Sequence, residues 1–406
     1  MTGFEPATLA SQTRCATTAL HPGLKRGYYI FDTASRIMQA PHGMLKTLEQ
    51  IYGTRKSQSR YDGLVCTFDL DKTYLDTRFE SLRKLVRIPF EKAEDKRNIP
   101  GAAAIVRELR RGTSAKAPPV PIYFISGSPE GMEAVIKEKL KLDGVSFDGI
   151  LFKNWRSAVK KLQFKKIIDK IGFKLAALLY ARSVYPPRAR ELLFGDDSEY
   201  DATIYALYSD IVSGRLTDYE TLTILKKWDV AADEMELIRE NMNRLKASDY
   251  KPRDVVQNIF IHLDQSTPAH FHTSLSDKVI PTQNYFQTAV ILYKIDAITR
   301  AGLYRVISDM MRNNNFGVTE FSVSTEDLLR RGVIDRGEAR KLLKTIYKGN
   351  PLALPRRIIS DLKSEFVRTI NTVTRMPENI MPVRRATDQG LTLVEKYLRH
   401  SPKRHV

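Results

Sequence analysis

The sequence predicts an α/β fold with more than one domain. Three short runs of apolar, β-branched and aromatic residues have the composition of buried strands, and amphipathic helical patterns lie between them. The chain has 406 residues, more than one average domain, and 42% of them are hydrophobic, which is enough for a sizeable core. Small or acidic residues follow each of the three runs, so we looked for chemistry at the strand ends.

The first strand, 64–68, runs directly into two carboxylates, Asp69 and Asp71. In a phosphoryl-transfer site Asp69 could attack phosphorus and form an aspartyl phosphate. Asp71 could then protonate the leaving oxygen and later deprotonate water. Thr73 could fix the turn. A capped turn before a helix accounts for the same residues equally well.

The second strand, 121–125, ends in Ser126 and Gly127. The hydroxyl of Ser126 and the backbone N–H of Gly127 could each donate a hydrogen bond to a phosphoryl oxygen. Taken singly, this stretch is also typical of an ordinary turn.

The third strand, 191–194, leads into an acidic loop that contains Asp196, Asp197 and Asp201. So many carboxylates in one loop are costly to desolvate unless a cation neutralises them, and carboxylate and phosphate oxygens are the ligands that Mg²⁺ prefers. Before this strand, Lys174 stands at the start of a helical pattern. There it could hold the nucleophile and offset charge on the transferred phosphoryl group.

The order of these four motifs resembles that of the haloacid dehalogenase-like (HAD) phosphohydrolases, from about residue 60 to residue 210. The resemblance implies a Rossmann-like three-layer sandwich whose parallel sheet carries the motifs at the carboxyl ends of its strands. It also implies the residue roles: Asp69 as nucleophile, Asp71 as acid and base, Thr73, Ser126, Gly127 and Lys174 as substrate ligands, Asp69, Asp71, Asp196 and Asp197 as Mg²⁺ ligands, and Asp201 in support.

A narrower resemblance is to the catalytic domain of the App1-like phosphatidate phosphatases. It rests on the spacing of Phe68–Thr73, Pro100-Gly101, Tyr123–Pro129, Lys174, Tyr185-Pro186 and Gly195–Tyr205. Three motifs depart from the family pattern: Lys72 replaces Asp, Gly127 replaces Asn, and 197–199 replace Ser-Gly-Gln. These departures lie in loops that would face the substrate. The resemblance therefore implies the reaction chemistry more directly than it implies a lipid substrate.

The remaining helical patterns define the expected domains. Helices are predicted around 105–109, 132–142, 204–212, 217–246, 286–311, 324–347 and 355–376, and a further strand at 256–263 is expected to end the sheet. We expect an N-terminal extension at 1–58, a phosphatase domain at 59–275 with a helical insertion at 213–252, and a mainly α-helical region at 276–406. That last region offers no chemistry, so packing or partner binding is its expected role.

We expect a small cap or none over the site. The segments 74–120 and 130–172 are too short for a large cap domain, and an open site would admit bulky substrates.

The N-terminal residues, to about position 22, are similar to peptides that arise when gene prediction reads through a transfer-RNA gene. The natural start would then be Met38 or Met44, and we expect no fixed fold before it. Two cysteines, Cys15 and Cys66, give no disulfide framework, which favours a reducing cytoplasm. No stretch is apolar for long enough to span a membrane.

The formal net charge is +18, from 65 basic and 47 acidic residues. Lysines and arginines are dense in 153–174, next to the proposed catalytic lysine. This segment, together with the basic C-terminal tail, could attract an anionic substrate, an anionic membrane surface or a nucleic acid. A solvated helix face explains the same pattern equally well.

Several histidines lie close together near residue 265. His262, Asp264, His270 and His272 could be drawn as a zinc site, but their spacing matches no zinc motif. A substrate contact is the better interpretation of His262.

The sequence therefore predicts a Mg²⁺-dependent phosphatase that hydrolyses a phosphomonoester through an aspartyl phosphate, with a phosphatidate-type lipid as one substrate. A phosphatase acting on nucleic-acid ends or nucleotides is the alternative within enzymes. A non-catalytic scaffold or binding protein is the alternative outside them, although a scaffold has no use for so many acids at one place.

Overall fold

The computed structural model describes residues 41–52, 61–77, 92–153, 170–198, 200–264, 272–314, 316–348 and 392–400, together with single positions between 364 and 371. The basic segment between 153 and 170 and most of the helical pattern at 355–376 lie outside these ranges.

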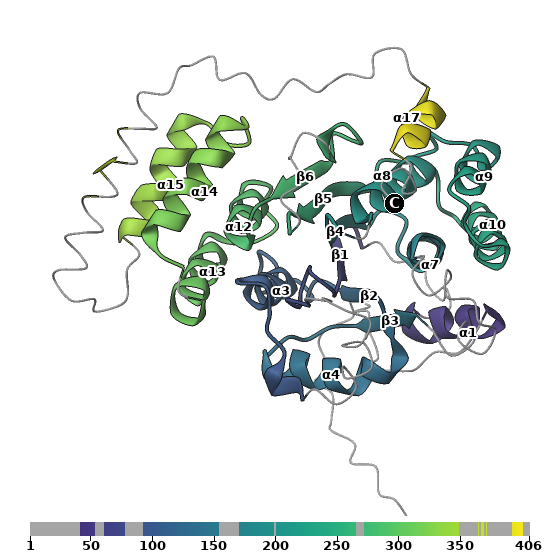
Figure 1. The fold of residues 1–406 in the computed structure, drawn as a ribbon, viewed down its shortest axis with the longest axis horizontal. Coiled ribbons are helices and arrows are strands. Elements are labelled where there is room, and N and C mark those ends of the chain that lie inside the picture. The colour runs from purple at the N-terminus through teal and green to yellow at the C-terminus, as the bar shows by residue number, and fades with distance from the viewer. Residues whose placement is uncertain are drawn as a thin grey trace, which may run out of the picture. The chain divides into compact units, whose positions relative to one another are not determined.

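A six-stranded sheet forms the centre of the fold (Figure 1). Its strands are β1 (Leu64–Asp69), β2 (Ile122–Pro129), β3 (Gly149–Lys153), β4 (Arg190–Asp196), β5 (Val256–His262) and β6 (Val279–Thr282). Their order is β3-β2-β1-β4-β5-β6, and every neighbouring pair is parallel. This confirms the predicted α/β class with a parallel sheet.

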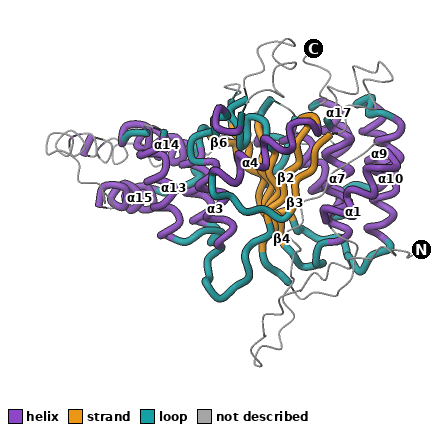
Figure 2. The backbone as a smooth tube through the Cα atoms, turned by 90° about the horizontal axis from the view of Figure 1, so that it is seen from below, coloured by secondary structure: helices purple, strands orange, loops and turns teal. Residues whose placement is uncertain are grey.

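Helices cover both faces of the sheet (Figure 2), which explains why the strands are apolar at nearly every position. Alternate residues of each strand point to opposite faces. Phe68, Phe124 and Phe194 enter one core, shared with the helices α3 (Ala102–Arg111), α4 (Glu133–Leu142), α12 (Tyr285–Lys294) and α13 (Arg300–Asn313). On the other face lie α1 (Pro41–Tyr52), α7 (Ile171–Val184), α8 (Asp201–Val212) and α10 (Ala232–Lys246).

The sheet continues one strand further than the sequence suggests. β6 pairs in parallel with β5, with Ile259 opposite Val279, so the expectation that the sheet ends at 256–263 is wrong. β6 has only four residues, one of them Pro281, and such a short run gives little strand signal. The expected helices before β5 are present as α9 (Asp218–Lys227) and α10.

The mainly helical C-terminal region is packed against the sheet rather than set apart from it. Together with α14 (Val318–Arg330) and α15 (Arg336–Lys348), α12 and α13 share one hydrophobic core with β1 and β2. Glu108 on α3 accepts hydrogen bonds from both Nε and Nη2 of Arg305 on α13, at 2.7 and 2.6 Å. No helix among the described residues is long and apolar enough to cross a membrane.

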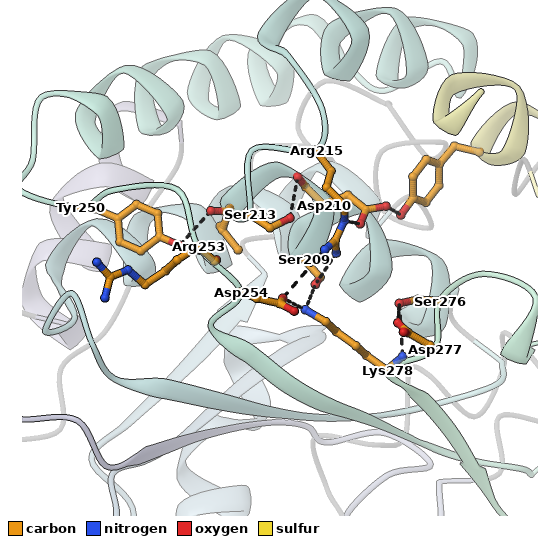
Figure 3. A network of polar contacts seen from close by, with 12 residues as sticks. Ser209, Asp210, Ser213, Arg215, Tyr250, Arg253, Asp254, Ser276, Asp277 and Lys278 are labelled. Atoms are coloured by element: carbon orange, nitrogen blue, oxygen red, sulfur yellow. Dashed lines mark hydrogen bonds and ion pairs between the residues drawn. The ribbon is translucent and has the colours of Figure 1, made fainter.

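The last described helix, α17 (Leu393–Arg399), is attached to the catalytic part of the chain through a buried tyrosine. Tyr397 donates a hydrogen bond to Asp210 Oδ2 at 2.5 Å, and its carbonyl accepts one from Trp228 Nε1 at 3.2 Å. Asp210 also pairs with Arg215, and nearby Lys278 donates to Ser209 at 3.0 Å (Figure 3). This polar network fixes the far end of α8, the helix whose first turn enters the acidic loop.

A buried ion pair joins α7 to β4. Arg182 Nη1 lies 2.7 Å from Glu191 Oε1, and Tyr208 donates a hydrogen bond to the other oxygen of Glu191 at 2.8 Å. Arg182 also donates to the carbonyls of Pro186 and Ala189. The network positions α7, which carries Lys174.

We predict that Arg182→Met lowers the free energy of unfolding by about 3–5 kcal/mol, because it leaves the buried carboxylate of Glu191 without its cation. Arg239→Met is the matched control. Arg239 pairs with Glu236 on an exposed helix face, and its loss is expected to change stability by less than about 0.5 kcal/mol. Urea unfolding of both variants checks the prediction, which equal effects would contradict.

Candidate active site

Three strand ends meet at the carboxyl edge of the sheet. Asp69 is the last residue of β1, Ser126 lies in the second half of β2, and Asp196 is the last residue of β4. Because β1 lies between β2 and β4, these residues are brought together where the strand order reverses, which is where open parallel sheets bind ligands.

The centre of the site is a cluster of three buried carboxylates. One oxygen each of Asp69, Asp196 and Asp201 lies within 4.8 Å of the others, and all three side chains are 0% exposed. Asp201, the first residue of α8, packs directly over Gly195. A Cβ at Gly195 would lie 2.5 Å from the Cβ of Asp201, so glycine is required for this close approach.

Lys174 provides positive charge at this cluster. From the first turn of α7 its ammonium reaches Asp69 Oδ1 at 2.8 Å and Asp201 Oδ1 at 2.5 Å, and it is also 0% exposed. Three carboxylates and one ammonium would leave a buried net charge of about −2, which is costly to keep out of water. The all-oxygen donor set therefore fits a hard divalent cation such as Mg²⁺.

Asp71 lies beside the C-terminal half of β2 and outside the three-carboxylate cluster. Its Oδ2 accepts a hydrogen bond from Ser128 Oγ at 2.5 Å and a longer one from Ser126 Oγ at 3.4 Å. Among the described residues, none donates a hydrogen bond to its Oδ1. The sequence analysis missed Ser128. Its position two residues after Ser126, on the same face of a strand, was the signal for it.

Asp197 links the ends of two strands. Its Oδ1 accepts a hydrogen bond from the backbone N–H of Asp264 at 2.8 Å, and its own N–H donates to the carbonyl of His262 at 3.1 Å. Of the expected metal ligands, the structure thus groups Asp69 and Asp196 with Asp201. The ligand roles of Asp71 and Asp197 stay predictions.

The part of the chain that holds these residues is similar to a known protein family. Residues 65–216 match the family model described as "Phosphatidate phosphatase APP1, catalytic domain". This segment is similar to an APP1 catalytic domain. The match confirms the resemblance seen in the motifs, and it covers every predicted site residue from Asp69 to Asp201. Phosphatidate phosphatases are phosphoric monoester hydrolases, so the chain belongs to this class of enzyme. No curated protein and no solved structure matches the chain.

A tyrosine from outside the matched segment supports the loop that follows β1. Tyr285, the first residue of α12, donates a hydrogen bond to the carbonyl of Thr73 at 2.6 Å. Burial and the nearby carboxylates of Asp196 and Asp69 raise the pKa of Tyr285, so it remains a donor. The Thr73 hydroxyl is buried and finds no hydrogen-bond partner among the described residues. No local pattern in the sequence indicates the Tyr285 contact.

Two residues in the loops of the candidate site adopt left-handed backbone conformations. Lys72, directly after Asp71, has φ 55°, and Tyr200, directly before Asp201, has φ 63°. Lys72 Nζ lies 3.0 Å from Asp264 Oδ2, which joins the loop after β1 to the segment that follows β5. Left-handed residues other than glycine cost on the order of 1–3 kcal/mol, and such strain is concentrated at functional sites.

The histidines do not form the zinc arrangement among the described residues, where only Asp69, Asp196 and Asp201 come close enough to share an ion. His270 lies outside the described ranges. The ring of His262 stacks on Tyr285 with centroids 5.7 Å apart, and burial lowers its pKa, which favours a neutral imidazole. A substrate contact by His262 stays a prediction.

We predict that Asp196→Asn weakens the binding of Mg²⁺ by at least about tenfold, because it removes one carboxylate of the cluster. Asp197→Asn, whose oxygen is bound to the backbone of Asp264, is expected to change the affinity by less than about threefold. Isothermal titration with Mg²⁺ compares the two. A larger loss in Asp197→Asn would instead support the ligand set expected from the sequence.

Proposed function

We propose that this enzyme hydrolyses a phosphatidate-type phosphomonoester through an aspartyl phosphate on Asp69, with Mg²⁺ as cofactor. The observation that carries the proposal is the buried group of Asp69, Asp196 and Asp201 around Lys174, at the carboxyl edge of an APP1 domain. When bound, a divalent cation would offset charge on the phosphoryl oxygens.

In the first step, a carboxylate oxygen of Asp69 attacks phosphorus, and the bond from phosphorus to the leaving oxygen breaks. Asp71 gives its proton to that oxygen, and the alcohol departs. Lys174, 2.8 Å from Asp69, holds the nucleophile in one orientation. The hydroxyl of Ser126 and the N–H of Gly127 would donate to the phosphoryl oxygens.

In the second step, water attacks the phosphorus of the aspartyl phosphate and the bond to Asp69 breaks. Asp71, now ionised, takes a proton from that water, so inorganic phosphate leaves and both aspartates return to their initial states. The hydrogen bond from Ser128 to one oxygen of Asp71 leaves its other oxygen for proton transfer in both steps.

The match to a phosphatidate phosphatase catalytic domain supports a lipid phosphate over a nucleic-acid end. In the basic segment, Lys153 pairs with Glu234 at 3.4 Å and Lys174 pairs with the aspartates, so these two do not form a nucleic-acid surface. The rest of the segment, from 154 to 169, lies outside the described residues. The domain boundaries and the cytoplasmic location stay predictions.

We expect the wild-type enzyme to hydrolyse p-nitrophenyl phosphate only when Mg²⁺ is present, and to lose this activity with a chelator. Asp69→Asn should reduce the rate by roughly a thousandfold or more, since the amide cannot act as the nucleophile. Release of p-nitrophenol measures both effects. If the wild type shows no metal-dependent turnover on any phosphomonoester, the proposal is wrong.

A substrate panel separates the lipid from its alternatives. We expect phosphatidate in mixed micelles to give a higher kcat/KM than 3′- or 5′-phosphorylated oligonucleotides and small sugar phosphates. The release of inorganic phosphate measures every member of the panel in the same way. A preference for the oligonucleotides would favour the nucleic-acid alternative and contradict the lipid assignment.

A further inference from the structure

A second lysine at the start of α7 lies beside the active site. Lys170 immediately precedes the helix, and its carbonyl accepts the backbone hydrogen bond of Lys174 at 3.0 Å. Residues four apart lie on the same side of a helix, so Lys170 follows the side of α7 that carries Lys174 into the carboxylates. No hydrogen bond from the Lys170 side chain caps the helix, so the side chain is not needed to start it.

The end of the Lys170 side chain lies on Gly127. A Cβ built at Gly127 would lie 2.3 Å from both Cδ and Cε of Lys170 and 2.8 Å from its Nζ. Gly127 does not have a positive φ, so its backbone does not itself require glycine. The space over Gly127 is therefore taken by the lysine, and any other residue at position 127 would displace it.

Gly127 is also the centre of the proposed phosphoryl-binding loop. On one side of it Ser128 donates to Asp71, and on the other Ser126 would donate to a phosphoryl oxygen in the proposed function. The Lys170 ammonium thus lies at the loop where the phosphoryl group would be bound.

The charges of the site explain why a second positively charged side chain would help to bind the phosphoryl group. Three buried carboxylates and Lys174 sum to about −2, which one divalent cation would cancel. A dianionic phosphoryl group then brings two further negative charges. The ammonium of Lys174 already contacts two aspartates, so a further cation at the phosphoryl oxygens would lower the cost of binding.

We propose that Lys170, seated on Gly127, is a substrate-binding residue that contacts the oxygens of a dianionic phosphoryl group. This inference rests on the proposed function for the identity of the substrate. The binding of inorganic phosphate tests it independently of turnover.

The test is a double-mutant cycle on the full chain, with isothermal titration of inorganic phosphate in the presence of Mg²⁺. Lys170→Ala should raise the Kd by about tenfold. Gly127→Ala should raise it by a similar factor, because the new methyl group displaces only the flexible end of Lys170. In the double variant the Kd should be no higher than in Lys170→Ala, since the displaced group is already gone.

Two further variants separate a specific contact from a general charge effect. Lys170→Arg should restore most of the affinity, and Lys246→Ala, which removes an exposed charge paired with Asp218, should leave the Kd unchanged. The inference is overturned if Lys170→Ala keeps the wild-type Kd within twofold, if the two single effects add, or if the wild type binds no phosphate. Phosphate binding with the expected cycle but without turnover would overturn the proposed function alone.

Discussion

The active site depends on the cost of burying three carboxylates within 4.8 Å of one another. In isolation such a group would repel itself and would take up protons, because charge away from water is disfavoured. Lys174 offsets part of the charge through contacts to Asp69 and Asp201. The remaining negative charge favours the binding of a divalent cation, so the same electrostatic cost that destabilises the fold creates the metal-binding capacity of the site.

This cost explains how the surrounding elements are arranged. α7 must hold the ammonium of Lys174 at a fixed distance from the carboxylates. The buried ion pair between Arg182 and Glu191 joins that helix to β4. Phe194 stacks between Phe68 and Phe260, at 4.0 and 5.0 Å, so β1, β4 and β5 are held together just before their catalytic ends. The repelling carboxylates are thus attached to strands that cannot move apart without breaking this aromatic packing.

The sequence could predict the parts of the site that follow directly from a strand end. Asp69, Ser126 and Asp196 each lie at or near the end of an apolar run, and the order of parallel strands is what brings such ends together. The sequence predicts Asp197 as a metal ligand and Asp201 only in support, whereas the structure groups Asp201 with Asp69 and Asp196. Which carboxylates of this segment turn inward depends on tertiary packing, here the close approach of Asp201 to Gly195.

Tertiary contacts over long sequence distances account for what was missed. Tyr285 contacts Thr73 across 212 positions of the chain, and nothing near either residue signals the contact. β6 is recognisable only because β5 is beside it to pair with. Both belong to the part of the chain past residue 275, where the sequence showed no chemistry. The hydrogen bond from Tyr285 makes α12 a support of the nucleophile loop, so the C-terminal helices contribute to the site through packing. Because that loop also holds Lys72 in a left-handed conformation, the support from α12 helps to offset the strain beside Asp71.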